Sequence, residues 1–168
     1  MVKSDNLYRE RETHSLRINA PRDRVFPLAC PVEELKWIDG WAYEMIYSES
    51  GRNEEDCIFV EEMSAGHIMG PERTGRTFWV TTLYDPPGGI INFLLVRDTT
   101  LTRFEILMRD ADRNATEVQW RMTITALSEE AHGSFDEGLK DRMRSMMVFL
   151  GESLKHYCET GAKLLWGS

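Results

Sequence analysis

Apolar and polar residues follow two different periods along this chain. Before residue 128, short runs rich in β-branched and aromatic residues stand between turn-forming residues, which is typical of strands. Over residues 134–162, apolar residues recur at spacings of three and four, with charged residues between them. These apolar positions are Leu139, Met143, Met146, Met147, Leu150, Leu154 and Tyr157. The spacing predicts one amphipathic helix of roughly 28 residues, about 42 Å long.

Seven runs before this helix are predicted to be strands. They span residues 12–19, 42–48, 57–63, 76–84, 90–97, 101–109 and 116–127. In the last run Val118, Trp120 and Met122 alternate with polar residues, and in the run before it Phe104 and Ile106 do the same. One face of each of these two strands is therefore expected to be buried. The pattern leaves open which face of the strands 57–63, 76–84 and 90–97 is buried.

Two short helices are predicted between the first and second strands. Pro21 stands at the start of residues 22–29, and Pro31 ends that segment and can start the next, 32–38. The remaining connections are short, so successive strands should pair antiparallel. The order predicts an α+β fold, an antiparallel sheet that packs on the long C-terminal helix. We expect a single domain over residues 1–168, with 1–11 as a polar N-terminal extension.

Several short sequence motifs in the chain resemble those of one superfamily. They are INAPRDRVF at 18–26, Trp37 after the paired short helices, GRTF at 75–78 and ATEVQW at 115–120. In this order they resemble the START-like superfamily, also called SRPBCC or helix-grip, in its bacterial polyketide cyclase/dehydrase-like branch. The resemblance implies a strongly curved sheet of about seven strands around the C-terminal helix. It also implies an apolar cavity for lipids, isoprenoids or aromatic polyketides.

Composition excludes several other functions. The net charge of -8 argues against nucleic acid or an anionic membrane as a partner. No apolar run reaches the roughly 20 residues that cross a bilayer, so we expect no membrane insertion. The three cysteines are scattered, which favours a cytoplasmic location, and no histidines or cysteines have metal-ligand spacing. We therefore expect no metal and no cofactor, and a monomer or homodimer.

The large aromatic residues and methionines are candidates to line the cavity. The predicted ligand-binding residues are Trp37, Trp41, Trp79, Tyr84, Asn92, Phe104, Trp120, Met122, Met143, Met147 and Leu150. Aromatic rings and flexible methionines suit an apolar ligand of variable shape. Tyr84 or Asn92 would orient the ligand through a polar group.

Two residues are candidates for acid–base chemistry. Glu61 and Glu62 are adjacent in a strand, so one of them must face inward if the strand stays regular. Glu62 and His67 are the candidates, His67 within the glycine-rich segment 66–75, which is expected to be a lid. These residues keep three hypotheses open: a binding protein for a small hydrophobic ligand, a polyketide cyclase/dehydratase-type enzyme, and a partner-binding module that uses Leu164, Leu165 and Trp166.

Overall fold

The computed structural model describes residues 8–63, 75–133 and 135–165. The elements at the start of the chain are β1 (Arg9–Ile18), α1 (Arg22–Val25), the 3₁₀ helix η1 (Phe26–Leu28) and α2 (Pro31–Glu34). The remaining strands are β2 (Tyr43–Tyr47), β3 (Ile58–Met63), β4 (Gly75–Asp85), β5 (Ile90–Val96), β6 (Thr100–Asp112) and β7 (Ala115–Ala126). The chain then forms α3 (Glu129–Gly133) and α4 (Leu139–Thr160).

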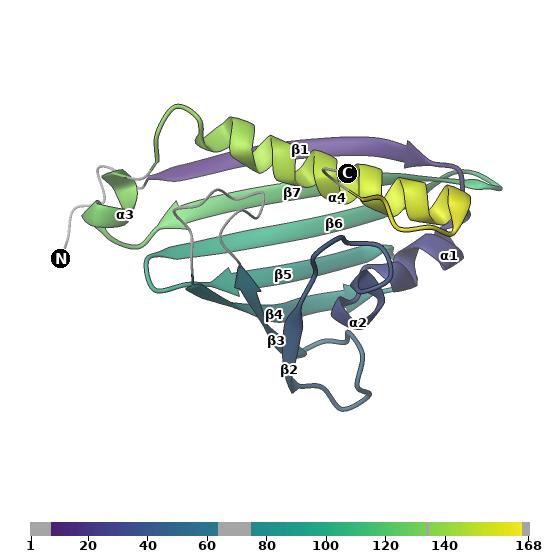
Figure 1. Ribbon diagram of the computed structural model, residues 1–168, viewed down its shortest axis with the longest axis horizontal. Coiled ribbons are helices and arrows are strands. Elements are labelled where there is room, and N and C mark those ends of the chain that lie inside the picture. Colours follow the sequence, from purple (N-terminus) through teal and green to yellow (C-terminus); the bar gives the residue numbers. More distant parts are fainter. Residues whose placement is uncertain (1–7, 64–74, 134, 166–168) are drawn as a thin grey trace.

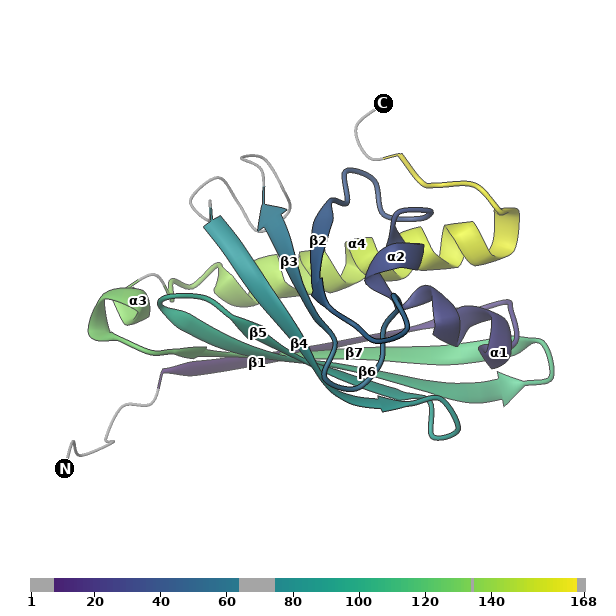
Figure 2. The ribbon, with the colours of Figure 1, turned by 90° about the horizontal axis from the view of Figure 1, so that it is seen from below.

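The strands form one antiparallel sheet in the order β1-β7-β6-β5-β4-β3-β2. β2 to β7 are neighbours in sequence order, whereas β1 joins the far edge by pairing with β7. The sheet is strongly curved, and Figure 2 shows β2, β3 and β4 turning up toward the side on which α4 lies. α4 therefore lies across the concave face, with α1 and α2 near its C-terminal end (Figure 1). This confirms the helix-grip prediction.

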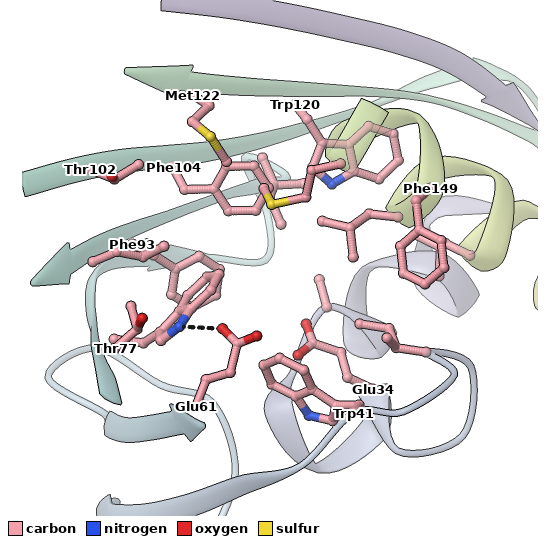
Figure 3. Close-up of a pocket in the computed structure, with 18 of the residues that line it drawn as sticks. Glu34, Trp41, Glu61, Thr77, Phe93, Thr102, Phe104, Trp120, Met122 and Phe149 are labelled. Carbon is pink, nitrogen blue, oxygen red and sulfur yellow. Dashed lines mark hydrogen bonds between the residues drawn. The ribbon is translucent and has the colours of Figure 1, made fainter. Parts of the chain in front are cut away.

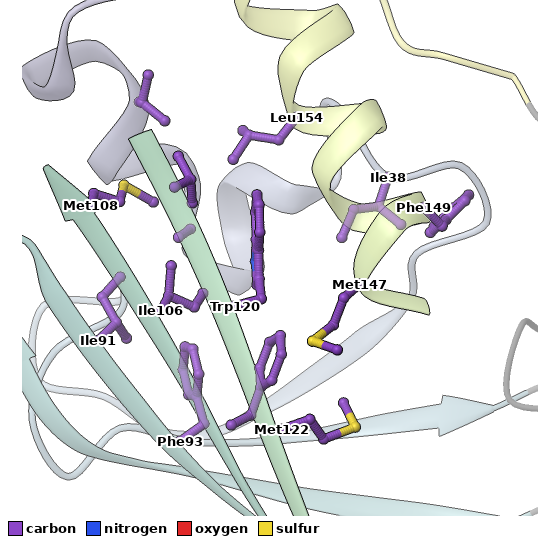
Figure 4. Packing of buried hydrophobic residues seen from close by; sticks show 14 of the residues in the cluster. Ile38, Ile91, Phe93, Ile106, Met108, Trp120, Met122, Met147, Phe149 and Leu154 are labelled. Carbon is purple, nitrogen blue, oxygen red and sulfur yellow. The ribbon is translucent and has the colours of Figure 1, made fainter. Parts of the chain in front are cut away.

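The inner face of the sheet carries the predicted alternation. Phe104, Ile106, Val118 and Trp120 are all buried, and β6 and β7 pair directly. Their neighbour Glu105 lies on the outer face, where its carboxylate forms an ion pair with Arg103 at 2.8 Å. Inward side chains from the sheet and from α4 pack together as one core (Figure 4). The strand periods predicted from the sequence are therefore confirmed.

The structure also settles the faces that the sequence left open. Phe59 and Glu61 of β3 lie on the same side of that strand, and Thr77 and Trp79 do so in β4. In β5 the buried residues include Phe93. These residues all face the concave side, toward α4.

The predicted C-terminal helix was too long at its N-terminal end. α4 begins at Leu139, because Asp136 accepts a hydrogen bond from the Gly138 amide at 2.9 Å and forms a turn there. Its last turn ends at Gly161, whose φ of 76° is the left-handed conformation favoured after a helix. The helix α3 before it was not predicted. The two early helices are also shorter than predicted, with η1 completing the first of them.

The first strand begins earlier than predicted, and it forms the main contact with α4. β1 starts at Arg9, within the segment expected to be an extension. Its inward glutamates form ion pairs with the helix, from Glu12 to Arg144 at 3.0 Å and from Glu10 to Lys140 at 3.1 Å. None of the helices in the described part of the chain has the length and apolar character needed to cross a membrane.

Candidate ligand-binding cavity

A cavity of about 100 Å³ lies between the concave face of the sheet and α4. Strands β3 to β7 form its floor, α4 its roof, and α2 with the following turn one side. It exists because the sheet curves away from the straight helix, so side chains from the two elements fill the space between them incompletely. Figure 3 shows Phe93, Phe104, Trp120, Met122 and Phe149 around it.

Seven of the predicted ligand-binding residues line this cavity. They are Trp37, Trp41, Trp79, Phe104, Trp120, Met122 and Leu150. The aromatic rings at the β3–β4 side pack edge to face, with Trp41 and Trp79 at 6.4 Å and an interplanar angle of 88°. Trp79 also contacts Phe93 edge to face at 5.4 Å. The wall is thus largely aromatic and is fixed by ring-to-ring contacts.

Four predicted residues do not line the cavity. Met143 and Met147 are fully buried in the core beneath α4. The Tyr84 ring packs against Phe26 at 5.4 Å. Asn92 alternates with the buried residues of β5, so its side chain lies on the outer face of the sheet.

The cavity has one polar side, formed by α2, β3 and β4. Glu34 and Glu61 point into it, and Thr77 lies beside them (Figure 3). The indole N–H of Trp79 donates a hydrogen bond of 3.0 Å to Oε2 of Glu61. Further along the wall lie Arg97, Thr100 and Thr102.

Glu34 is the residue whose chemistry the cavity changes most. Burial of its carboxyl group, followed by the negative charge of Glu61, raises its pKa to about 8. At neutral pH Glu34 is therefore mainly a neutral carboxylic acid that can donate a hydrogen bond, with Glu61 as the charged partner. A proton-donating group with a pKa near physiological pH, inside an apolar cavity, is suited to acid–base chemistry.

The sequence argument placed one of the adjacent pair Glu61 and Glu62 inward, and Glu61 is the one that lines the cavity. Glu62 lies in β3, and its side chain is outside the described part. His67 and Trp166 lie outside the described residues, and so does the predicted lid except for Gly75, which begins β4.

Glu34 itself was missed, although helical spacing could have indicated it. Trp37, Ile38 and Trp41 follow it at intervals of three, four and seven residues, which place them on one helical face. All four residues line the cavity. Within the described ranges, no group of three or more His, Cys, Asp or Glu residues could hold a metal ion.

Comparison with known proteins reveals similarity of structure and not of sequence. No protein-family model and no curated protein matches the sequence. Norcoclaurine synthase from Thalictrum flavum, a point mutant in complex with a transition-state analogue, is 10% identical with a TM-score of 0.68, over 93% of this chain and 98% of that one. The ZhuI aromatase/cyclase from Streptomyces sp. R1128 is 8% identical with a TM-score of 0.65, over 94% of this chain and 100% of that one.

A START superfamily protein from Mycobacterium smegmatis is 11% identical with a TM-score of 0.67, over 90% of this chain and 99% of that one. All three structures are matched over nearly their whole length, so the likeness extends to the sheet, the short helices and the long helix together. This protein has the START-like, or helix-grip, fold.

Proposed function

We propose that this protein binds a small hydrophobic molecule in the cavity between the sheet and α4. The observation that carries the proposal is a cavity with aromatic side chains in its wall, inside the hydrophobic core. Burial of an apolar ligand there would be favoured by about 25 cal/mol per Å² of apolar surface removed from water. The same fold in proteins named aromatase/cyclase and norcoclaurine synthase supports a role for the cavity in holding organic molecules.

The size of the cavity restricts the ligand. An apolar protein cavity of about 150 Å³ is enough to hold benzene, whereas sites for drug-sized ligands are about 300–1,000 Å³. At about 100 Å³ this cavity is smaller than both, and it is closer in size to the first, which favours a single ring or a short isoprenoid unit over a larger ligand. A multi-ring polyketide would require the walls to move apart.

Native mass spectrometry of freshly purified protein, followed by denaturing extraction, tests this proposal. We expect a near-stoichiometric small hydrophobic molecule, or a rise in melting temperature with single-ring aromatic compounds, because binding to the folded state alone stabilises it. A bound ligand should also change the fluorescence of Trp41 and Trp79, which line the cavity. If the protein carries nothing and no compound in a panel of lipids, isoprenoids and aromatics changes its melting temperature, the proposal is wrong.

Acid–base catalysis in the same cavity is a second candidate function, because Glu34 and Glu61 face the space where a ligand would lie. In a cyclisation or dehydration, Glu34 would donate a proton to a carbonyl or hydroxyl oxygen. Once a ligand has been identified, Glu34→Gln should abolish its conversion while leaving its binding within about threefold, since Gln keeps the shape of the side chain. Conversion at the wild-type rate in this variant would exclude Glu34 as the acid.

The cysteines support the compartment that we propose, the cytoplasm. Cys30, Cys57 and Cys158 are all free thiols, as is usual in a reducing environment. Burial raises the pKa of Cys57 to about 11, so this thiol is unreactive at neutral pH.

A further inference from the structure

We propose that the ligand carries an uncharged carbonyl oxygen, and that Thr77 and Glu34 are the hydrogen-bond donors that the polar side of the cavity offers to it. The inference rests on the proposed binding function and specifies the chemical class of the ligand. It follows from two side chains of the cavity wall that can each donate a proton and that have no acceptor within the part of the chain that the structure describes.

The hydroxyl group of Thr77 is the first of these donors. Thr77 lies in β4, its side chain is only 2% exposed, and it lines the cavity. Within the described ranges its oxygen has no hydrogen-bond partner. Buried hydroxyl groups are rarely left in this state, because an unpaired one loses the hydrogen bonds that water would give it. We infer that a ligand atom supplies the missing partner.

Two fully buried threonines elsewhere in the sheet are paired, which sets Thr77 apart. The Thr81 hydroxyl, four residues further along β4, donates to Oδ1 of Asn53 at 2.6 Å. The Thr116 hydroxyl donates to the backbone oxygen of Ala20 at 2.8 Å. Neither of these threonines lines the cavity, whereas Thr77 does. The fold thus provides acceptors for these two threonines and leaves the Thr77 hydroxyl unpaired where a ligand would lie.

The carboxyl group of Glu34 is the second donor. Glu34 ends the short helix α2, and Figure 3 shows its carboxyl group directed into the cavity. Among the described residues no ion pair or side-chain hydrogen bond involves it, whereas its neighbour Glu33 is paired with Lys36. Burial, followed by the charge of Glu61, raises the pKa of Glu34 to about 8. Near pH 7 this group is therefore mainly an uncharged donor.

Two donors without an acceptor favour a ligand that accepts hydrogen bonds and donates none. A carbonyl oxygen has two lone pairs and no proton of its own, so it can accept from either donor. A hydrocarbon would leave both donors unpaired, and a carboxylate would bring a charge out of water. The rings of Trp41 and Trp79 in the same wall suit a carbonyl group that is attached to a single ring.

Acetophenone and α-methylstyrene are matched probes for this carbonyl group. They have the same ring and nearly the same shape, and a CH₂ group in the second replaces the oxygen of the first. Each is titrated at pH 7 into the wild type and into Thr77→Val, by calorimetry or tryptophan fluorescence. The variant should bind acetophenone about tenfold more weakly and α-methylstyrene within about twofold of the wild type, because valine has the shape of threonine without its hydroxyl. Comparing each probe with itself in two proteins removes the difference in how well water solvates the probes.

Thr82→Val is the matched control. Thr82 lies in the same strand, is exposed and does not line the cavity, and its hydroxyl donates to the backbone oxygen of Asn92 at 3.2 Å. This variant should bind both probes as the wild type does. The melting temperature of Thr77→Val without ligand should be no lower than that of the wild type, because valine removes an unpaired hydroxyl. A large fall would show that the hydroxyl has a partner within the protein, and would overturn the inference.

The pH dependence of binding tests Glu34 separately, because acetophenone itself does not ionise between pH 6 and pH 9. The wild-type affinity for acetophenone should fall about tenfold over this range, because ionised Glu34 cannot donate. The other charged or ionisable groups near Glu34 are Glu61 of β3, Tyr43 of β2 and Arg97 of the cavity wall, to which α4 contributes only apolar side chains. They remain in Glu34→Gln, whose amide group donates at every pH, so this variant should show no such fall.

Three results would overturn the inference. They are an equal effect of Thr77→Val on both probes, an acetophenone affinity of the wild type that is the same at pH 6 and pH 9, and a fall with pH that persists in Glu34→Gln. Provided that α-methylstyrene binds, the proposed binding function stands in each case. If neither probe binds to the wild type, the binding function fails together with the inference.

Discussion

Glu33 and Glu34 are adjacent in α2, and their surroundings shift their pKa values in opposite directions. The hydrogen bond from Lys36, with help from Arg52, lowers the pKa of Glu33. Burial and the charge of Glu61 raise that of Glu34 to about 8. The pKa values differ because the two side chains point in different directions. That of Glu33 points toward Lys36 and Arg52, and that of Glu34 points into the cavity. Glu33 is held in ion pairs with Lys36 and Arg52, whereas the carboxyl group of Glu34 faces the cavity.

The raised pKa of Glu34 predicts how stability depends on pH. The folded protein holds this proton up to about pH 8, whereas the unfolded chain releases it near pH 4.5. The folded state is therefore progressively disfavoured as the pH rises from about 4.5 to 8. Glu34→Gln removes this effect, so the variant should match the wild type at pH 4 and exceed it at pH 8.5 by at most about 5 kcal/mol.

Urea unfolding of both proteins at a series of pH values measures this difference. Glu105→Gln, on the outer face, is the control, and it should not become more stable than the wild type at high pH, because this substitution removes an ion pair. If the free energies of unfolding of Glu34→Gln and the wild type stay parallel from pH 4 to 8.5, the carboxyl group of Glu34 has an ordinary pKa.

For single residues, the sequence predicts the apolar wall of the cavity better than its polar side, where Glu34 and Glu61 lie. Large aromatic residues with strand or helix periodicity fall on the cavity, as Trp79, Phe104 and Trp120 do. Strand alternation also requires one of Glu61 and Glu62 to face inward. Glu34 could not be recognised by charge alone, because Glu33 beside it has the same side chain and the helix is only four residues long. Which of the two carboxyl groups faces the cavity depends on tertiary packing.

At the scale of elements, the hairpin between β4 and β5 approaches β6 closely. Gly89 has a φ of +69°, and a Cβ atom added there would lie 2.2 Å from the backbone oxygen of Met108. The Met108 amide also donates a hydrogen bond of 2.8 Å to the Gly89 oxygen. The absence of a side chain at residue 89 is thus what lets the turn pack beside β6.

Gly51 offers a matched comparison for a substitution at this turn. It has a similar φ of +74°, but an added Cβ atom would meet nothing within 4 Å. Gly51→Ala should cost about 1 kcal/mol for the left-handed conformation alone. Gly89→Ala should cost a further 1–3 kcal/mol, roughly the effect of overpacking, because β6 backbone must move. Urea unfolding of the two variants measures the difference, and equal losses would contradict a close approach at Gly89.

The sequence predicted the strands and the long helix correctly, because each has a regular pattern of apolar residues. It predicted the ends of these elements less well where a local turn or a polar residue decides the boundary. All seven strands were expected, since each is bounded by turn residues and most have one buried face. The start of α4 was not, because apolar residues cannot reveal that Asp136 forms a turn with Gly138. The start of β1 was also misjudged, because Glu10 and Glu12 are polar residues that nevertheless face α4 and pair with its cations.

At the scale of the whole molecule, the fold is preserved with almost no sequence identity. Structures that superpose with TM-scores of 0.65 to 0.68 share only 8 to 11% of their residues with this chain. The pattern of buried and exposed positions is what such distant proteins can share, because many apolar residues fill a given place in a core. The residues inside the cavity are free to differ, so the site must be argued from its own groups.

The pairing of β1 with β7 has a consequence for the order in which the molecule can be completed. A ribosome makes β1 first, but its hydrogen-bonding partners, from Thr116 to Thr125, are among the last strand residues to emerge. β2 to β7 can meanwhile form hairpins one after another, since each pairs with its neighbour in sequence. Until β7 is made, β1 remains an unpaired strand, and the cavity lacks the wall that holds Trp120 and Met122. The cavity can therefore be complete only after β7 and α4 have been made.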